Sequence, residues 1–245
     1  MTKRTPTIAR HPLSILRLAL LAGMVGGTVV WGADEAKRET PGSRSLPALT
    51  SSLKTNLDYC QQWLDGQDFK TLAQTAAGVS IVADALARKS DEATAKACQE
   101  ILQSAKALET AARSKNAAAS STELARLRTK VIELKPAASK ADAPLAKPTV
   151  GSVRSMMDLL EGTLGDAKTG AAVGDLPSAK INAQVLAELG EVMSTYKTDA
   201  RWKGWNDDFI ARSQAVAASE STDPATIKQL LKEVSLSCER CHKKK

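Results

Sequence analysis

Aromatic residues and histidines are scarce in this chain, and each shortage excludes a class of structure or function. Phe, Trp and Tyr make up 3% of the 245 residues. No stripe of Lys and Arg is interleaved with them, so the sequence lacks the pattern of a nucleic-acid-binding surface. Alternating runs of Val, Ile and Thr between turn residues, which mark strands, are also absent. The two histidines, His11 and His242, limit the number of imidazole ligands and bases.

Helix-forming residues dominate the remainder of the chain. It is rich in Ala, Leu, Lys, Glu and Gln, a composition that predicts a nearly all-helical protein. Prolines with Ala, Ser and Lys between them interrupt the helical pattern over residues 136–150, as an extended linker would. We therefore predict an all-α fold of two tandem antiparallel four-helix bundles, over residues 34–135 and 151–245, each large enough to bury its own core.

The amino terminus has the features of a secretory signal peptide. Four basic residues and no acidic one precede Asp34, an apolar stretch covers residues 18–30, and small residues follow at Gly32 and Ala33. The stretch is short and rich in glycine for a membrane span, so removal of residues 1–33 is favoured over an uncleaved anchor. We expect an exported, periplasmic protein without a stable membrane anchor, whose net charge falls from +7 to +3 when the four basic residues are removed.

Apolar residues at helical spacing predict four helices in the second half. The first ends before Gly174, which suits a helix C-cap, and the second begins near Pro177. The third covers about residues 202–218, and the fourth opens with Thr222 or Asp223 as its N-cap. The residues expected to face the core of this bundle are Val153, Met156, Met157, Leu160, Leu164, Ile181, Val185, Leu186, Leu189, Met193, Ile227, Leu230, Leu231 and Val234.

The last residues of the chain contain the sequence Cys238-Glu239-Arg240-Cys241-His242, the attachment pattern of a c-type haem. Continuing the fourth helix through this sequence places both cysteines on one side of a helical turn. Their thiols can then add to the two vinyl groups of one porphyrin, and the adjacent imidazole can bind the iron. We predict one covalently attached haem c, with His242 as its proximal iron ligand.

Two other interpretations of the cysteine pair are less consistent with the chain. A thioredoxin-like redox pair sits at the start of a helix that follows a strand, whereas this pair closes a helical, Ala-rich segment. A zinc site needs a fourth ligand, and the other thiols, Cys60 and Cys98, are far away in sequence. Because His11 is removed with the signal peptide, His242 is the remaining imidazole, and no base is left for catalysis. We expect a protein that is not an enzyme.

The first half is weakly similar to the second, as a diverged repeat would be. Two sets of apolar residues align, at shifts of 107 and 103 residues. The aligned sets are Val82, Ala85 and Leu86 with Leu189, Val192 and Met193, and Leu124, Leu127 and Val131 with Ile227, Leu230 and Val234. The shift of 103 places Lys135 and Ala138 opposite the haem cysteines, so residues 34–135 are predicted to form a haem-free bundle. Its Cys60 and Cys98 are either free buried thiols or a disulfide.

Residues 151–245 resemble the class II cytochromes c, the family of cytochrome c′ and its low-spin relatives. Members of this family are four-helix bundles with Cys-x-x-Cys-His close to the carboxyl terminus. The resemblance extends to three further segments, which are Arg154-x-x-Met157, Gly174-Asp175-Leu176-Pro177 and Trp202-Lys-Gly-Trp205-Asn-Asp-Asp-Phe209.

The resemblance implies a distal ligand and a packing residue. In this family a Met of the first helix either binds the iron or is replaced by an apolar residue that leaves that side open, which makes Met157 or Met156 the distal candidate. An aromatic residue of the third helix packs near the porphyrin, which makes Phe209 the corresponding candidate. A bound Met thioether implies electron transfer, and an open site implies binding of nitric oxide or carbon monoxide. The presence of two Met residues favours electron transfer.

Partners are predicted from the carboxyl-terminal charge and from the repeat. Lys243 to Lys245 would either steer an acidic redox partner or form a solvated tail. Many members of the resembled family pair as homodimers through helices one and two, and a tandem copy can supply that partner within one chain. We expect a monomer whose two bundles pack together, with a homodimer or two independent bundles as alternatives. A third functional hypothesis is a protein in which the first bundle binds a partner and the haem is secondary.

Overall fold

The structure, a computed structural model, describes residues 41–137, 151–196 and 200–243, with the backbone alone at 41–44 and 241–243. Over these residues the chain forms eight α-helices and no strand, which confirms the predicted all-α fold. They belong to one compact unit that starts at Glu39. None of the described helices contains a stretch long and apolar enough to span a bilayer. The predicted signal peptide and residues 138–150 of the predicted linker lie outside the described part of the chain.

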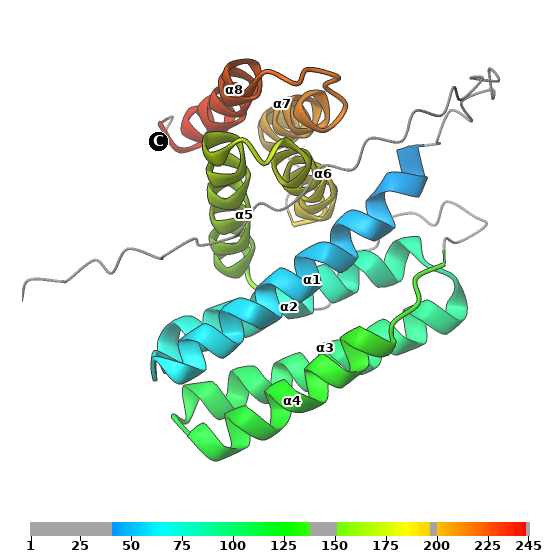
Figure 1. Cartoon of the computed structure of the whole chain (residues 1–245), viewed down its shortest axis with the longest axis vertical. Coiled ribbons are helices and arrows are strands. Elements are labelled where there is room, and N and C mark those ends of the chain that lie inside the picture. The colour runs from blue at the N-terminus through cyan, green and yellow to red at the C-terminus, as the bar shows by residue number, and fades with distance from the viewer. Residues whose placement is uncertain (1–40, 138–150, 197–199, 244–245) are drawn as a thin grey trace, which may run out of the picture. The chain divides into compact units, whose positions relative to one another are not determined.

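The first four helices form an antiparallel bundle (Figure 1). They are α1 (Pro41–Asp65), α2 (Phe69–Lys89), α3 (Glu92–Arg113) and α4 (Ala117–Glu133). Each packs against the next, and α4 returns to α1. The connections are two or three residues long, and such short loops force consecutive helices to run in opposite directions.

The last four helices form a second bundle of the same kind. They are α5 (Val153–Val173), α6 (Leu176–Met193), α7 (Ala200–Ala217) and α8 (Pro224–Lys243). Sequential helices pack side by side, and α8 closes the bundle against α5. The described helices therefore form the two tandem four-helix bundles that the sequence predicts, whereas the predicted domain boundaries stay predictions.

Local sequence rules account for the helix ends of the second bundle. Gly174 ends α5 in a left-handed conformation (φ 83°), which a residue without Cβ adopts at little cost. Asp175 caps α6 by accepting a hydrogen bond from the backbone N–H three residues later (3.1 Å). Of the two predicted caps of α8, Asp223 takes the role, since its carboxylate accepts from the N–H groups of Ala225 and Thr226 (3.0 Å each).

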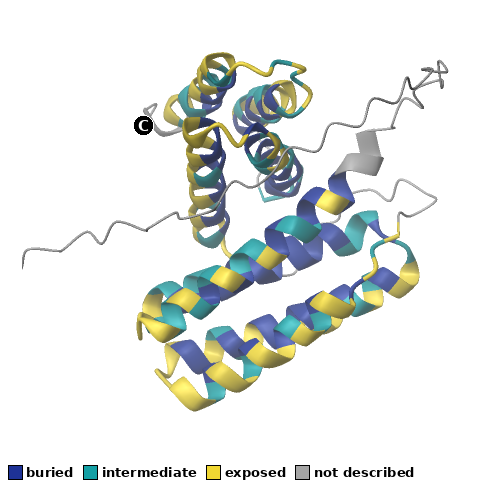
Figure 2. Cartoon of the chain, in the orientation of Figure 1, coloured by how far each residue is buried: buried dark blue, intermediate teal, exposed yellow. Residues whose placement is uncertain are grey.

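Buried residues follow the inner face of each helix, with two departures from the predicted core (Figure 2). Ile181 is 42% exposed and Val153 is 37% exposed. The sequence predicts that the apolar residues of α6 lie on a single buried face. From Val185 to Gly190, however, every residue is buried, because α6 contacts α1 and α2 as well as its own bundle. Ile181 precedes that doubly covered segment.

Two pairs of helices, one helix from each bundle, start at a common offset. α2 and α6 begin 107 residues apart, and so do α4 and α8. The residue that caps each of these four helices is Asp or Asn. The shift of 103 predicted for the last helix is therefore wrong by four residues. At 107, the counterparts of Cys238 and Cys241 are the buried apolar residues Val131 and Leu134.

The two bundles contact each other through their first two helices. α1 packs against α6, and α2 packs against both α5 and α6. Tyr59 of α1 donates a hydrogen bond to Asp166 of α5 (2.7 Å). Lys89 of α2 forms ion pairs with Glu188 and Glu191 of α6, the second at 2.8 Å.

Contacts across this interface are arranged as they would be if a two-fold axis related the two bundles. The tyrosine and aspartate above are 107 residues apart, so the hydrogen bond joins the same position of the two bundles. The ion pair of Lys89 with Glu191 has its counterpart at Tyr196 and Asp84, because both residues are offset by 107. Burial, with a contribution from the Asp84 carboxylate, raises the pKa of Tyr196. Reciprocal contacts of this kind define an isologous interface.

Candidate functional site

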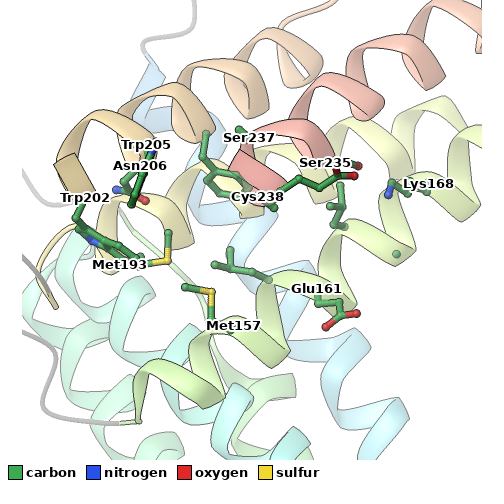
Figure 3. A pocket seen from close by; sticks show the side chains of 15 residues that line it. Met157, Glu161, Lys168, Met193, Trp202, Trp205, Asn206, Ser235, Ser237 and Cys238 are labelled. Atoms are coloured by element: carbon green, nitrogen blue, oxygen red, sulfur yellow. The ribbon is translucent and has the colours of Figure 1, made fainter. Parts of the chain in front are cut away.

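A cavity of about 580 Å³ lies in the second bundle, between α5, α7 and α8 and beside the end of α6 (Figure 3). Its volume falls within the range of roughly 300–1,000 Å³ that is common for small-molecule and cofactor sites. Its walls are mostly apolar or aromatic. These residues are Met157, Leu160, Leu164, Met193, Trp202, Trp205 and Phe209.

Cys238, the first cysteine of the haem-attachment sequence, lines this cavity. Ion pairs hold α8 against α7 at this level. Arg212 of α7 bonds Glu233 of α8 (2.8 Å), and Arg240 of α8 reaches Asp208 of α7 (3.4 Å). Cys238 therefore lies between two residues of α8, Glu233 and Arg240, whose ion pairs hold this helix against α7.

Cys241 and His242 belong to the last turn of α8, and their side chains lie outside the described residues. Positions three and four residues after Cys238 fall on the same face of a helix as Cys238. The backbone of α8 thus carries the positions of Cys238, Cys241 and His242 on one face.

The two methionines of α5 have different surroundings. Met157 is half-buried and lines the cavity. Met156 is fully buried and is not a wall residue. The fold therefore brings Met157, and not Met156, to the same cavity as Cys238.

The third helix of the bundle supplies an aromatic wall. Phe209 is buried and lines the cavity together with Trp202 and Trp205. The guanidinium of Arg201 lies 4.9 Å from the ring centroid of Trp205, a cation–π contact that orients the indole. Phe209 is thus a wall residue, and its packing against a porphyrin stays a prediction.

Most wall residues are not identified as site residues by the sequence analysis, and three of them are informative. Met193 is assigned there to the core, and it is indeed buried, but it also faces the cavity. Gly165 contributes no side chain, and a Cβ at this position would meet no atom within 4 Å. Asn206 is 2% exposed. Its place on the buried stripe between Trp202 and Phe209 is a sequence signal, since a polar residue on such a stripe needs an explanation.

The first bundle has an exposed ion pair where the second bundle has small residues at the edge of the cavity. At the offset of 107, Asp58 and Arg128 of the first bundle correspond to Gly165 and Ser235 of the cavity wall. Arg128 reaches from α4 to α1 and bonds the Asp58 carboxylate at 3.1 Å. The second bundle has neither side chain, so this ion pair has no counterpart between α5 and α8.

Polar groups are few inside the cavity and more frequent at its rim. The Asn206 side-chain N–H donates to the backbone oxygen of Gly190 (2.8 Å). The other arm of the carboxamide, Oδ1, is buried and has no hydrogen-bond donor among the described residues. Glu161, Lys168 and Glu239 are exposed and line the edge of the opening. This distribution suits a largely apolar ligand with charged ends.

The remaining cysteines are buried thiols of the first bundle. Burial raises the pKa of Cys60 to about 12, against a smaller opposing effect of Arg128, and it raises the pKa of Cys98 to about 12. In the described part of the chain, no Cα atom of α1 lies within 8 Å of one in α3. A disulfide requires a Cα separation below about 7 Å, so of the two predicted alternatives the free thiols are the observed form.

Comparison with known proteins adds no relative. No protein-family model, no characterised protein and no solved structure matches the chain. The resemblance of residues 151–245 to the class II cytochromes c therefore depends on the motif residues quoted above.

Proposed function

We propose that the second bundle carries one covalently attached haem c and that the protein is a one-electron carrier of the periplasm. The observation that carries this proposal is the cavity that opens beside Cys238, in a helix that continues through Cys241 and His242. The two cysteines would each form a thioether bond by adding S–H across a vinyl group. His242 would bind the iron.

The residues around the cavity fit a porphyrin. Apolar and aromatic walls would cover the faces of a flat hydrophobic ring and keep water away from its metal. The space over Gly165, where a Cβ would meet nothing within 4 Å, leaves room for a large ring against α5. When bound, a haem supplies an Fe(III)/Fe(II) couple whose potential the protein sets through ligands, hydrogen bonds and burial.

Met157 supports electron transfer over gas binding. It is on the wall of the cavity that Cys238 shares, and it is the described methionine of α5 that faces this space. A thioether ligand raises the reduction potential and occupies the position that nitric oxide or carbon monoxide would need. The five-coordinate alternative requires that Met157 stay away from the iron.

The other interpretations of the cysteine pair fit the surroundings less well. Redox-active pairs use the thiolate form favoured at the start of a helix, whereas Cys238 lies in the last turns of α8, at the opposite pole of the helix dipole. Cys60 and Cys98 are buried in the core of the first bundle, so they are not placed to complete a zinc site with Cys238.

The test is maturation of the full chain, with its signal peptide, in a host that attaches c-type haem. We expect a coloured protein whose mass exceeds that of the polypeptide by one haem, and whose reduced form resists carbon monoxide. The double variant Cys238→Ala/Cys241→Ala should lose the covalent haem, whereas the matched variant Cys60→Ala should keep it. A colourless protein with the mass of the polypeptide would refute the proposal. A reduced form that binds carbon monoxide would instead support the five-coordinate alternative.

A further inference from the structure

We infer that Asn206 lowers the reduction potential of the haem site through a carbonyl dipole held in the wall of the cavity. This inference rests on the proposed function. Asn206 lies on α7, is 2% exposed and lines the cavity that Cys238 and Met157 share (Figure 3). Its side-chain oxygen, Oδ1, is buried and has no hydrogen-bond partner among the described residues.

The orientation of the carboxamide follows from its surroundings. Gly190 offers only an acceptor, its backbone oxygen, so the arm of Asn206 that faces it at 2.8 Å must be the NH₂ group. The helices meet closely there, because a Cβ on Gly190 would come within 2.6 Å of Ile210 and 3.2 Å of Phe209. This close contact leaves the carboxamide little freedom to turn, and its oxygen points away from α6.

The unused acceptor of that buried oxygen adds nothing to the stability of the fold. No donor among the described residues reaches Oδ1, and a buried acceptor without a donor destabilises the fold. The first bundle avoids this cost. Its buried stripe on α3 matches that of α7 at an offset of 108, and it has Cys98, a thiol that behaves as a small apolar group, where α7 has Asn206. The polar group occurs in the bundle that has the cavity.

Electrostatics gives the sign of the effect. Ferric haem carries one more positive charge than ferrous haem, so a nearby carbonyl oxygen stabilises the oxidised form. A dipole that is fixed in an apolar, water-poor cavity acts more strongly than the same dipole in water. Removing it should shift the ratio of reduced to oxidised haem at a given applied potential about fivefold towards the reduced form. For a one-electron couple with 59 mV per tenfold change, this is roughly +40 mV.

The experiment is a spectroelectrochemical titration of the matured full chain and of Asn206→Leu, which keeps the volume and removes the dipole. The matched control is Ser213→Ala. Ser213 lies on the same stripe of α7, is fully buried and has a hydroxyl oxygen without a partner among the described residues, but it does not line the cavity. We expect a higher midpoint potential in Asn206→Leu and no shift in Ser213→Ala. An unchanged potential in a fully haem-loaded Asn206→Leu protein overturns the inference and leaves the proposed function intact, whereas absence of haem from the parent chain refutes the latter.

Asn206→Asp keeps the test decisive if the leucine variant does not fold. A protonated carboxyl can donate to the Gly190 oxygen as the amide does, and it becomes a full negative charge when it ionises. Its potential should equal that of the parent at low pH and fall below it as the pH rises. Glu161 and Lys168 of α5 and Glu239 of α8 also line the cavity, and no charged residue of α6 or α7 does. The parent carries the same charged residues, so its curve is the baseline, and a constant difference between the two curves overturns the inference.

Discussion

Replacing Lys89 by methionine tests the buried charge cluster that joins the two bundles. The Glu188 side chain is 4% exposed and bonds the Lys89 ammonium, the Ser45 hydroxyl (2.5 Å) and the Gln184 amide (2.7 Å). Lys89 itself is 26% exposed and has a second partner, Glu191, at 2.8 Å. Without Lys89, the buried Glu188 carboxylate has no charged partner. Without Glu188, Lys89 still has Glu191 as its partner.

That difference sets the expected magnitudes. Lys89→Met leaves the Glu188 carboxylate buried without a counter-charge, which costs about 3–5 kcal/mol in such sites. Because two neutral donors remain, we expect the lower end, about 3 kcal/mol of unfolding free energy. Glu188→Gln leaves Lys89 paired with Glu191, so the expected loss is about 1 kcal/mol. The double variant Lys89→Met/Glu188→Met should lie close to the parent, since a buried pair is often replaceable by apolar residues.

Urea unfolding followed by circular dichroism measures these values, with Glu191→Gln as the control that removes the more exposed partner. Burial disfavours the Lys89 ammonium, but Glu188 and Glu191 outweigh that effect, so the pKa of Lys89 is raised. The contribution of Lys89 is therefore complete below its unfolded pKa, near 10.4, and is lost as the pH rises through the folded pKa. A Glu188→Gln variant that loses as much stability as Lys89→Met, or a Lys89→Met variant that loses less than about 1 kcal/mol, would refute this reasoning.

Further predictions concern the cavity, the thiols and the oligomeric state. Met157→Leu should allow the reduced protein to bind carbon monoxide, whereas Met156→Leu should leave the visible spectrum unchanged and cost less than about 1.5 kcal/mol. Gly165→Phe should fill the space beside α5 and lower the haem content, measured as haem absorbance per polypeptide. Cys60 and Cys98 should react with a thiol reagent only on unfolding. Because the pKa of each is raised to about 12, the stability they contribute should decline between the unfolded value of about 8.5 and 12. Sedimentation of the full chain should give a monomer, and a tight dimer would contradict the intramolecular pairing.

The helix ends could be predicted because they depend on local rules. Gly174 and Asp223 act as the caps that their positions indicate, since a left-handed C-cap and an Asp N-cap need only neighbouring backbone groups. The exposure of Ile181 could not be predicted in the same way. The buried width of α6 depends on α1 and α2, which belong to a distant part of the chain.

The error in register has a specific cause. A shift of four residues is close to one helical turn of 3.6 residues, so apolar positions aligned at 103 and at 107 fall on nearly the same face. Periodicity alone cannot separate the two, whereas the helix starts at Ala117 and Pro224 can. Similarly, Gly165 belongs to the cavity wall through packing between helices, which no motif of the second bundle encodes, and the Trp202–Phe209 segment gives Asn206 a place but no role.

The two bundles share an interface but differ where the cavity lies, and few positions account for the difference. In the first bundle α4 ends at Glu133, so Leu134 lies beyond it, whereas the counterpart of Leu134, Cys241, is still helical in α8. The Arg128–Asp58 ion pair bridges α4 and α1, where the second bundle has small residues. These changes lie on the side of α1 that faces α4, whereas Tyr59 faces the other bundle. One copy could therefore lose a cofactor site and still serve as the partner that covers α5 and α6, because the two surfaces of α1 are separate.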